Sequence, residues 1–148
     1  MKLVVGSDHA GFPMKAGILA FLRERRHDVL DVGSFDPAPV DFPDIARKVA
    51  AAITSGDVQR GLMICGTGVG AAIGANKMKG IRAAVCHDVH SAHQSVEHDD
   101  VNVMCIGAQI VGPWLAKDLI AAYLDAKFST AEEFRRRVAK LADMDRAR

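Results

Sequence analysis

Short apolar runs rich in Val and Ile alternate along the chain with longer segments of helical period. Five of these runs have about the length of a strand: Leu3–Gly6, Val29–Val32, Leu62–Cys65, Ala83–Cys86 and Val103–Ile106. Because none of them alternates cleanly with polar residues, we expect both faces of each strand to be buried. The segments between and after them predict helices at Phe12–Arg25, Asp44–Ser55, Gly70–Met78, Val89–His98 and Pro113–Tyr123. This alternation predicts an α/β fold with a parallel sheet and helices on both of its faces.

The C-terminal segment has a different pattern. From Thr130 to Arg148 charged residues dominate, and Phe134, Val138 and Leu141 form one narrow apolar stripe. We therefore expect a helix over about residues 130–146 that extends to a partner subunit instead of completing its own core. The chain of 148 residues fits a single domain spanning 1–148.

Composition narrows the classes of function. The formal net charge is +1, so no field of one sign attracts nucleic acid. No apolar run reaches the roughly 20 residues that a membrane helix needs, so we expect no membrane partner. Three cysteines cannot all pair with one another and all lie in or at the end of apolar segments, which predicts reduced thiols in a cytoplasmic protein.

The strongest chemical signal is the loop Cys65-Gly66-Thr67-Gly68-Val69-Gly70, which ends the third predicted strand and opens a helix. Glycines let the backbone approach a ligand, and N–H groups at a helix N-terminus favour a phosphate or a developing oxyanion. Cys65 lies where the helix dipole favours a thiolate, which can act as a nucleophile or as a base. Cys86 and Cys105 are embedded in predicted strands, and we expect them to be core residues.

Other interpretations of these residues remain open. The glycine loop could be a tight turn without a ligand, or, with Asp88 about twenty residues on, a loose dinucleotide fingerprint. That fingerprint usually occupies the first strand turn, however, and here this turn carries Asp8 and His9. Substrates in parallel sheets bind at the carboxyl ends of strands, so these two residues could contact sugar hydroxyls and move protons. Asp8 could equally cap the following helix.

Histidines and arginines supply two further candidates. His87, His90 and His93 recur every three residues, but no Cys or Glu joins them at a suitable spacing, so we expect no metal. The run Arg135-Arg136-Arg137 is either a solvated helix face or a source of one phosphate contact.

Seven motifs occur in an order that is typical of one family. They are Gly6-Ser7-Asp8-His9-Ala10-Gly11, Asp41-Phe42-Pro43, Cys65-Gly66-Thr67-Gly68-Val69-Gly70, Asn76-Lys77, Gly80-Ile81-Arg82-Ala83-Ala84, His98-Asp99-Asp100-Val101-Asn102-Val103 and Gly107-Ala108-Gln109-Ile110-Val111-Gly112. Across almost its whole length the chain resembles the family of type B ribose-5-phosphate isomerases and galactose-6-phosphate isomerase subunits.

The resemblance implies a Rossmann-like three-layer fold with five parallel strands, a homodimer or dimer of dimers with active sites at the subunit interface, and no metal or organic cofactor. It implies that His98 helps to open the furanose ring of a sugar phosphate and that Cys65 then moves the proton through a cis-enediolate. Thr67 and the amides of Gly66, Gly68, Val69 and Gly70 would stabilise the oxyanion. The implied substrate contacts are Asp8, His9, Asp99 and Arg137.

Three positions depart from the family pattern. Asp99 stands where the family usually has Asn, and Gln109 and Glu133 stand where it has phosphate-binding arginines. Ribose 5-phosphate is the first substrate to expect, with galactose 6-phosphate or a tetrose phosphate as alternatives. A catalytically silent sugar-phosphate sensor on the same fold and a dinucleotide-dependent oxidoreductase are the rival functions.

Overall fold

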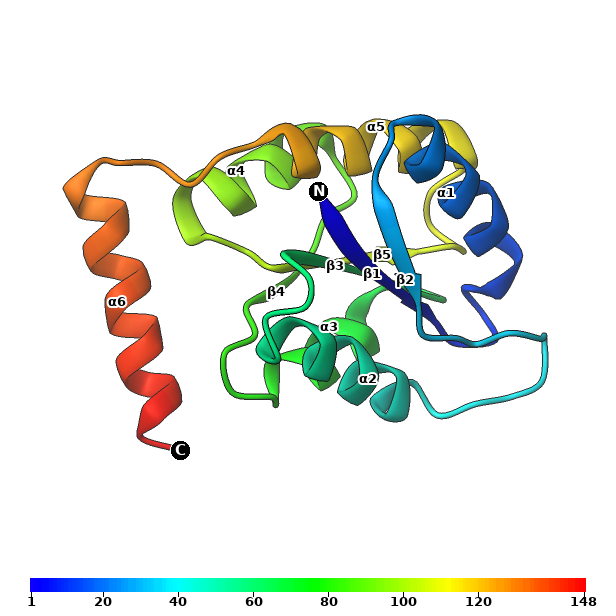
Figure 1. The fold of residues 1–148 in the computed structure, drawn as a ribbon, viewed down its shortest axis with the longest axis horizontal. Helices are drawn as coiled ribbons and strands as arrows, with labels where there is room; N and C mark the ends of the chain where they lie inside the picture. Colours follow the sequence, from blue (N-terminus) through cyan, green and yellow to red (C-terminus); the bar gives the residue numbers. More distant parts are fainter.

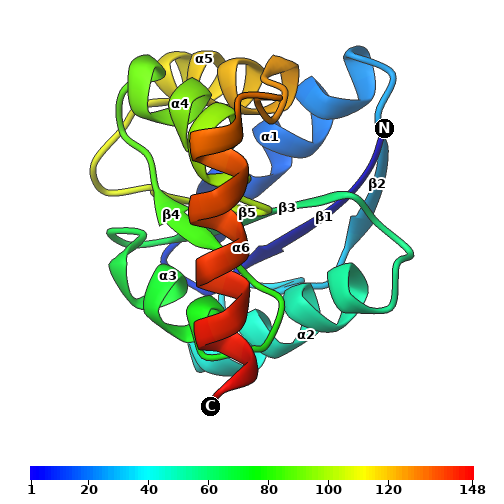
Figure 2. The same ribbon diagram turned by 90° about the vertical axis from the view of Figure 1, so that its left-hand side faces the viewer.

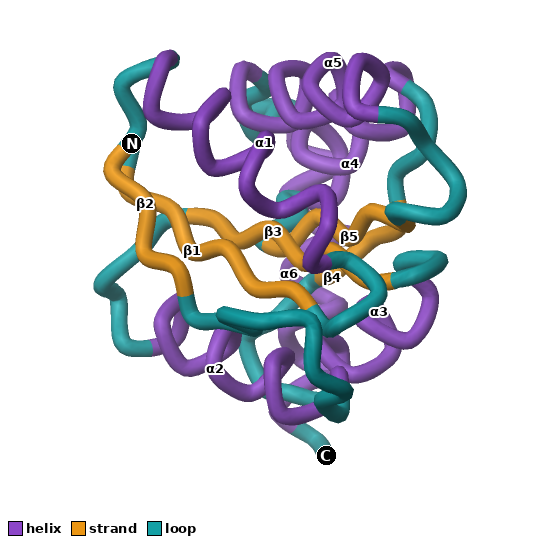
Figure 3. Tube along the Cα trace, turned by 90° about the vertical axis from the view of Figure 1, so that its right-hand side faces the viewer, coloured by secondary structure: helices purple, strands orange, loops and turns teal.

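A five-stranded parallel sheet lies between two layers of helices in the computed structural model, which describes all residues 1–148 (Figures 1 and 3). The strand order is β2-β1-β3-β5-β4, and the strands are β1 (Lys2–Ser7), β2 (Asp28–Asp31), β3 (Arg60–Cys65), β4 (Ala83–Val85) and β5 (Val103–Gly107). The sheet therefore confirms the predicted α/β architecture. None of the helices is long and apolar enough to cross a membrane.

Six helices surround or adjoin this sheet: α1 (Phe12–Glu24), α2 (Phe42–Thr54), α3 (Val69–Asn76), α4 (Val89–Asp99), α5 (Pro113–Asp125) and α6 (Glu132–Arg146). Helices α1, α4 and α5 cover one face, while α2 and α3 cover the other (Figure 3). Each face has its own buried apolar cluster, and β1 supplies both because Leu3 and Val5 point to one side and Val4 to the other. Pro43 and Pro113 occupy the first turns of α2 and α5, where a proline lacks no hydrogen bond that the helix needs.

The expectation that every strand is buried on both faces is wrong for β2. Its residues alternate between exposed and half-buried, and Leu30 is 42% exposed. The reason is position, because β2 is an edge strand that pairs only with β1. The central strands β1, β3 and β5 are buried almost throughout.

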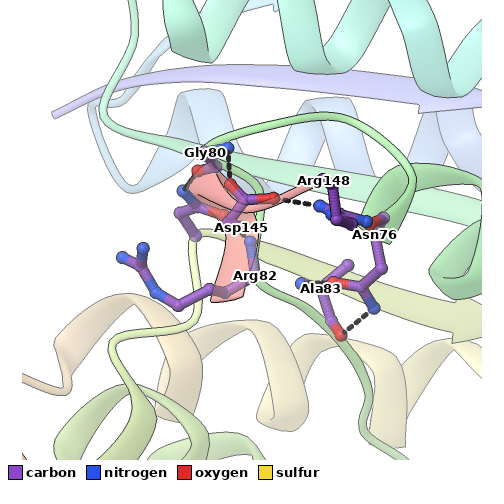
Figure 4. Close-up of polar contacts among 7 residues, drawn as sticks. Asn76, Gly80, Arg82, Ala83, Asp145 and Arg148 are labelled. Atoms are coloured by element: carbon purple, nitrogen blue, oxygen red, sulfur yellow. Dashed lines mark hydrogen bonds and ion pairs between the residues drawn. The ribbon is translucent and has the colours of Figure 1, made fainter. Parts of the chain in front are cut away.

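Helix α6 lies apart from the sheet, across the end of the molecule opposite to the carboxyl ends of the strands (Figures 1 and 2). None of its residues is buried. Its C-terminal end is held because the Gly80 N–H donates to Asp145 at 2.5 Å and Arg148 donates to the Asn76 carbonyl at 3.0 Å (Figure 4). The Asn76 amide also pairs with the N–H and C=O of Ala83 at 2.8 Å each, which covers the free edge of β4.

A groove of about 1020 Å³ separates α6 from the amino-terminal side of β4. Apolar side chains of α6, among them Leu141 and Met144, line one wall, and Ile81 and Val101 line the other. Helix α6 ends at Arg146, the expected residue, and begins at Glu132, two residues later than expected. Its packing on a second subunit stays a prediction.

Candidate active site

The ends of β1 and β3 bring the first candidate residues together, because these two strands are neighbours in the sheet. The Asp8 N–H donates to the carbonyl of Ile64 at 3.2 Å, one residue before Cys65. The buried Asp8 carboxylate accepts the N–H of Gly11 at 2.9 Å. Since α1 begins only after Gly11, Asp8 closes the turn that leads into the helix and is not the helix cap itself.

Cys65 is the last residue of β3, and its sulfur faces the glycine loop. The Gly68 N–H donates to Sγ at 3.0 Å, and Gly68 has φ +82°, a conformation that glycine adopts without strain. An N–H aimed at sulfur stabilises negative charge on it. All three thiols are buried, with Cys65 and Cys105 in one apolar cluster and Cys86 in the other. Burial raises the pKa of both Cys86 and Cys105. Among the three thiols, Cys65 is the one that has an N–H of the glycine loop directed at its sulfur.

The rest of the loop keeps free donors. The Thr67 hydroxyl accepts the Val69 N–H at 3.3 Å, so that amide is already engaged. The amides of Gly66, Thr67 and Gly70 donate to no protein acceptor. Three backbone donors at a helix N-terminus are thus available to an anion or a developing oxyanion.

Residues that follow β4 and β5 contact the glycine loop or the strand end beside it. The Gln109 N–H donates to the Gly66 carbonyl at 3.0 Å. A Cβ built on Gly66 would lie 2.9 Å from Gln109 Oε1, so the Gln109 side chain lies against the loop. His87 Nε2 accepts the Gly107 N–H at 2.9 Å and fixes the adjoining end of β4. The sequence had identified Gln109 only by its departure from the family pattern.

His9 is exposed and is oriented by the connection between β2 and α2. The Val40 N–H donates to His9 Nδ1 at 3.2 Å, and Nε2 has no hydrogen-bond partner in the chain. The same connection is anchored by Lys15, a buried residue of α1 that donates to Asp31 Oδ1 at 2.9 Å and to the Ser34 carbonyl. Sequence reasoning missed Lys15, because a lysine in an amphipathic helix gives no sign that it is buried.

The remaining candidates lie elsewhere in the chain. His98 and Asp99 are in the last turn of α4, which runs antiparallel to the strands and so ends at their amino-terminal side (Figure 1). Arg137 is in α6, beyond that same side. One chain therefore holds two separate groups of candidate residues. Asp8, His9 and the Cys65 loop lie at the carboxyl ends of the strands. His98, Asp99 and Arg137 lie beyond their amino ends.

Local contacts engage residues on which two other interpretations depend, the dinucleotide fingerprint and the histidine metal site. Asp88, the acid of the dinucleotide fingerprint, caps α4 and accepts the Ser91 N–H at 2.7 Å. Of the histidine series, His87 is bonded to β5 and His93 lies 3.4 Å from Glu97. No group of three His, Cys, Asp or Glu side chains in the chain is arranged to hold a metal ion.

Comparisons with known proteins fit this arrangement. The model of the family described as Ribose/Galactose Isomerase matches residues 3–141. An Escherichia coli protein named ribose-5-phosphate isomerase B is 45% identical over 127 residues, which is 86% of this chain and 85% of that protein. A Pectobacterium atrosepticum protein named D-erythrulose-4-phosphate isomerase is 42% identical, with 86% of this chain and 85% of that protein covered. The structure of Clostridium thermocellum ribose-5-phosphate isomerase B superposes with a TM-score of 0.96 at 42% identity and covers 99% of both chains.

The fold, the thiol beside a glycine loop and these relatives define an isomerase. The chain belongs to the Ribose/Galactose Isomerase family. The resemblance seen in the seven motifs is thereby confirmed.

Proposed function

We propose that this isomerase interconverts an aldose phosphate and a ketose phosphate through a cis-enediolate, with Cys65 as the base. The observation that carries the proposal is the Cys65 sulfur at 3.0 Å from the Gly68 N–H, beside a loop with three free amide donors. We take ribose 5-phosphate and ribulose 5-phosphate as the substrate pair, in keeping with the names of the Escherichia coli and Clostridium thermocellum relatives. A tetrose phosphate, suggested by the Pectobacterium relative, is the first alternative.

In this mechanism His98 opens the furanose ring, and Asp8 and His9 hold the sugar hydroxyls. The Cys65 thiolate removes the proton from C2 of the open aldose and returns it to C1. The hydroxyl proton on O2 passes to O1 over the same sequence, so no atom is gained or lost. The free amides of Gly66, Thr67 and Gly70 stabilise the charge on the enediolate oxygen, an effect worth about 3–4 kcal/mol per well-placed donor.

Such a site needs two copies of the chain, because His98 and Arg137 lie at the opposite edge of the sheet from Cys65 (Figure 1). We propose a homodimer in which each copy supplies these residues to the Cys65 loop of the other. Exposed apolar side chains flank the carboxyl edge and suit such a contact; they are Val69, Ile73, Val89 and Ile110.

Substrate and base are tested together by NMR in D2O. A panel of aldose phosphates and free aldoses is incubated with the enzyme, and ketose formation is followed. Ribose 5-phosphate should convert, while the Cys65→Ala enzyme should retain less than about a tenth of wild-type turnover, since no other thiol faces the loop. Greater residual turnover would exclude the thiolate as base, and conversion of another sugar alone would change the substrate.

Complementation tests the shared site. Cys65→Ala and His98→Ala chains are each expected to be inactive. A random mixture should regain about a quarter of wild-type activity, because half of the dimers are hybrids and each hybrid has one intact site of two. Sedimentation should show a dimer for both variants. Absence of regain in a mixed dimer would mean that both residues act within one chain.

A further inference from the structure

The aromatic ring of Phe134 contacts both members of the second group of candidates. Its centroid lies 3.9 Å from that of the His98 imidazole, with 14° between the ring planes. The guanidinium carbon of Arg137 lies 5.6 Å from the centroid of the same phenyl ring. From the sequence Phe134 was expected to form part of a subunit contact, so its position on His98 is a new observation.

The start of α6 is docked on the end of α4 around this stack. The Ser129 N–H donates to the Glu97 carbonyl at 2.9 Å, and Arg135 Nε donates to the Ser129 carbonyl at 2.8 Å. These bonds fix the backbone on either side of Phe134 and bring its ring to the imidazole. The first turn of α6 is therefore held in place independently of the groove farther along the helix.

The His98 ring has little else to orient it. It makes no hydrogen bond within the chain, and Glu97 Oε2 lies 4.0 Å from Nε2. Its side chain is 30% exposed. A group that transfers protons during ring opening needs its nitrogens free and its plane fixed. Stacking on a phenyl ring fixes the plane and leaves both nitrogens available.

We infer that Phe134 is a positioning residue for ring opening, which holds the His98 imidazole and the Arg137 guanidinium as one unit offered to the other copy of the chain. The inference rests on the proposed function, since it assigns Phe134 a role through His98. It predicts that loss of the phenyl ring impairs the step that uses His98 and spares the proton transfer that uses Cys65.

The two steps can be measured separately. Ribose 5-phosphate is a furanose in water and must be opened, whereas ribulose 5-phosphate cannot close a furanose because its C5 oxygen carries the phosphate. Turnover of ribose 5-phosphate therefore reports both steps. Incorporation of deuterium from D2O at C1 of ribulose 5-phosphate reports proton transfer alone.

Phe134→Leu should lower turnover of ribose 5-phosphate by about tenfold, the factor expected for a lost aromatic pair. Deuterium incorporation at C1 should stay within about twofold of wild type. Phe134→Tyr keeps the ring and should restore ribose 5-phosphate turnover. Val138→Ala shortens the same apolar stripe one turn further on and should change both rates by one common factor or neither.

A second measurement does not depend on turnover. The phenyl ring current shifts the His98 Hε1 resonance upfield, so Phe134→Leu should move that resonance downfield and Phe134→Tyr should not. An unmoved resonance in Phe134→Leu, or equal losses in both rates, would overturn the inference. If His98→Ala turns over ribose 5-phosphate normally, the proposed role of His98 fails; if only Phe134→Leu does, the positioning role alone fails.

Discussion

Removing the charge of Lys15 should destabilise the fold by about 3 kcal/mol. The Lys15 side chain is 4% exposed, and its Nζ lies 2.9 Å from Oδ1 of Asp31, whose side chain is 22% exposed. The ring centroid of Phe35 lies 5.0 Å from the same Nζ. Breaking a buried ion pair from one side costs about 3–5 kcal/mol, because the other charge stays behind unpaired.

The lower end of that range applies to Lys15→Met for two reasons. Asp31 keeps the N–H of Gly33 at 3.0 Å and some contact with water, so its carboxylate is not fully stranded. Methionine also fills most of the lysine volume and leaves little cavity. Asp31→Asn should cost more, because it leaves the better buried ammonium without a counter-charge. The double variant should lose less than the sum of the two single losses.

Urea denaturation followed by circular dichroism measures these differences, and a loss of about 3 kcal/mol corresponds to roughly 6–12 °C in Tm for a chain of this size. The matched control is Arg47→Met, which removes a pair with Asp44 whose partners are 68% and 63% exposed. That variant should stay within about 0.5 kcal/mol of wild type. If Lys15→Met loses less than about 1 kcal/mol, the Lys15 pair behaves like a surface pair and the reasoning is refuted.

Four further predictions follow from particular contacts. Iodoacetamide should inactivate the enzyme by alkylating Cys65 before Cys86 and Cys105. Mass spectrometry identifies the cysteine that is alkylated first, and an early adduct on Cys86 or Cys105 would contradict this prediction. Burial raises the pKa of Cys105, so the thiol loses its proton at a lower pH in the unfolded chain than in the folded one. The free energy of unfolding should therefore fall above about pH 9, by up to 1.4 kcal/mol per pH unit. In urea titrations between pH 8 and 10, Cys105→Ala should flatten this decline. Gly107→Ala places a Cβ 2.7 Å from the backbone of the glycine loop and should lower kcat/KM by about a hundredfold. The control is Gly17→Ala, whose Cβ would have no atom within 4 Å. It should leave kcat/KM unchanged and stabilise α1 by about 0.5–1 kcal/mol. EDTA should leave turnover unchanged, and loss restored by added zinc would show a metal that the histidine spacing did not predict.

The layout of the sheet could be predicted from the sequence because its central strands carry unbroken apolar runs, such as Leu62–Cys65, that only a doubly covered sheet can bury. The Cys65 loop followed from glycines at a strand end. What could not be predicted depends on tertiary neighbours. The exposure of Leu30 follows from the edge position of β2, and the burial of Lys15 follows from the fold of the β2–α2 connection around it.

Distances across the molecule were the other missing information. The sequence placed Cys65 at the end of a strand and His98 at the end of a helix. Because that helix, α4, runs antiparallel to the strands, His98 lies at their amino-terminal ends, away from Cys65. The apolar stripe of α6 predicted that Phe134 contacts a second subunit, yet its ring stacks on His98 of the same chain. The spacing of apolar residues in a sequence predicts which face of a helix is apolar. The residues that this face contacts are known only from the packed structure.

The structure also distinguishes among three consecutive arginines that the sequence left equivalent. Arg135 donates to the Ser129 carbonyl and lies over Phe128, and Arg136 faces Glu132 at 3.8 Å along its own helix. Arg137 alone lies beside Phe134 and has no carboxylate partner. With Gln109 and Glu133 in place of the family arginines, this one guanidinium is the phosphate contact that the proposed site retains. Arg137→Ala should therefore raise KM for a sugar phosphate by about ten- to a hundredfold and leave KM for a free sugar unchanged. The same kinetic assay, run with both substrates, measures the two KM values. An equal change for both would mean that the phosphate is held elsewhere.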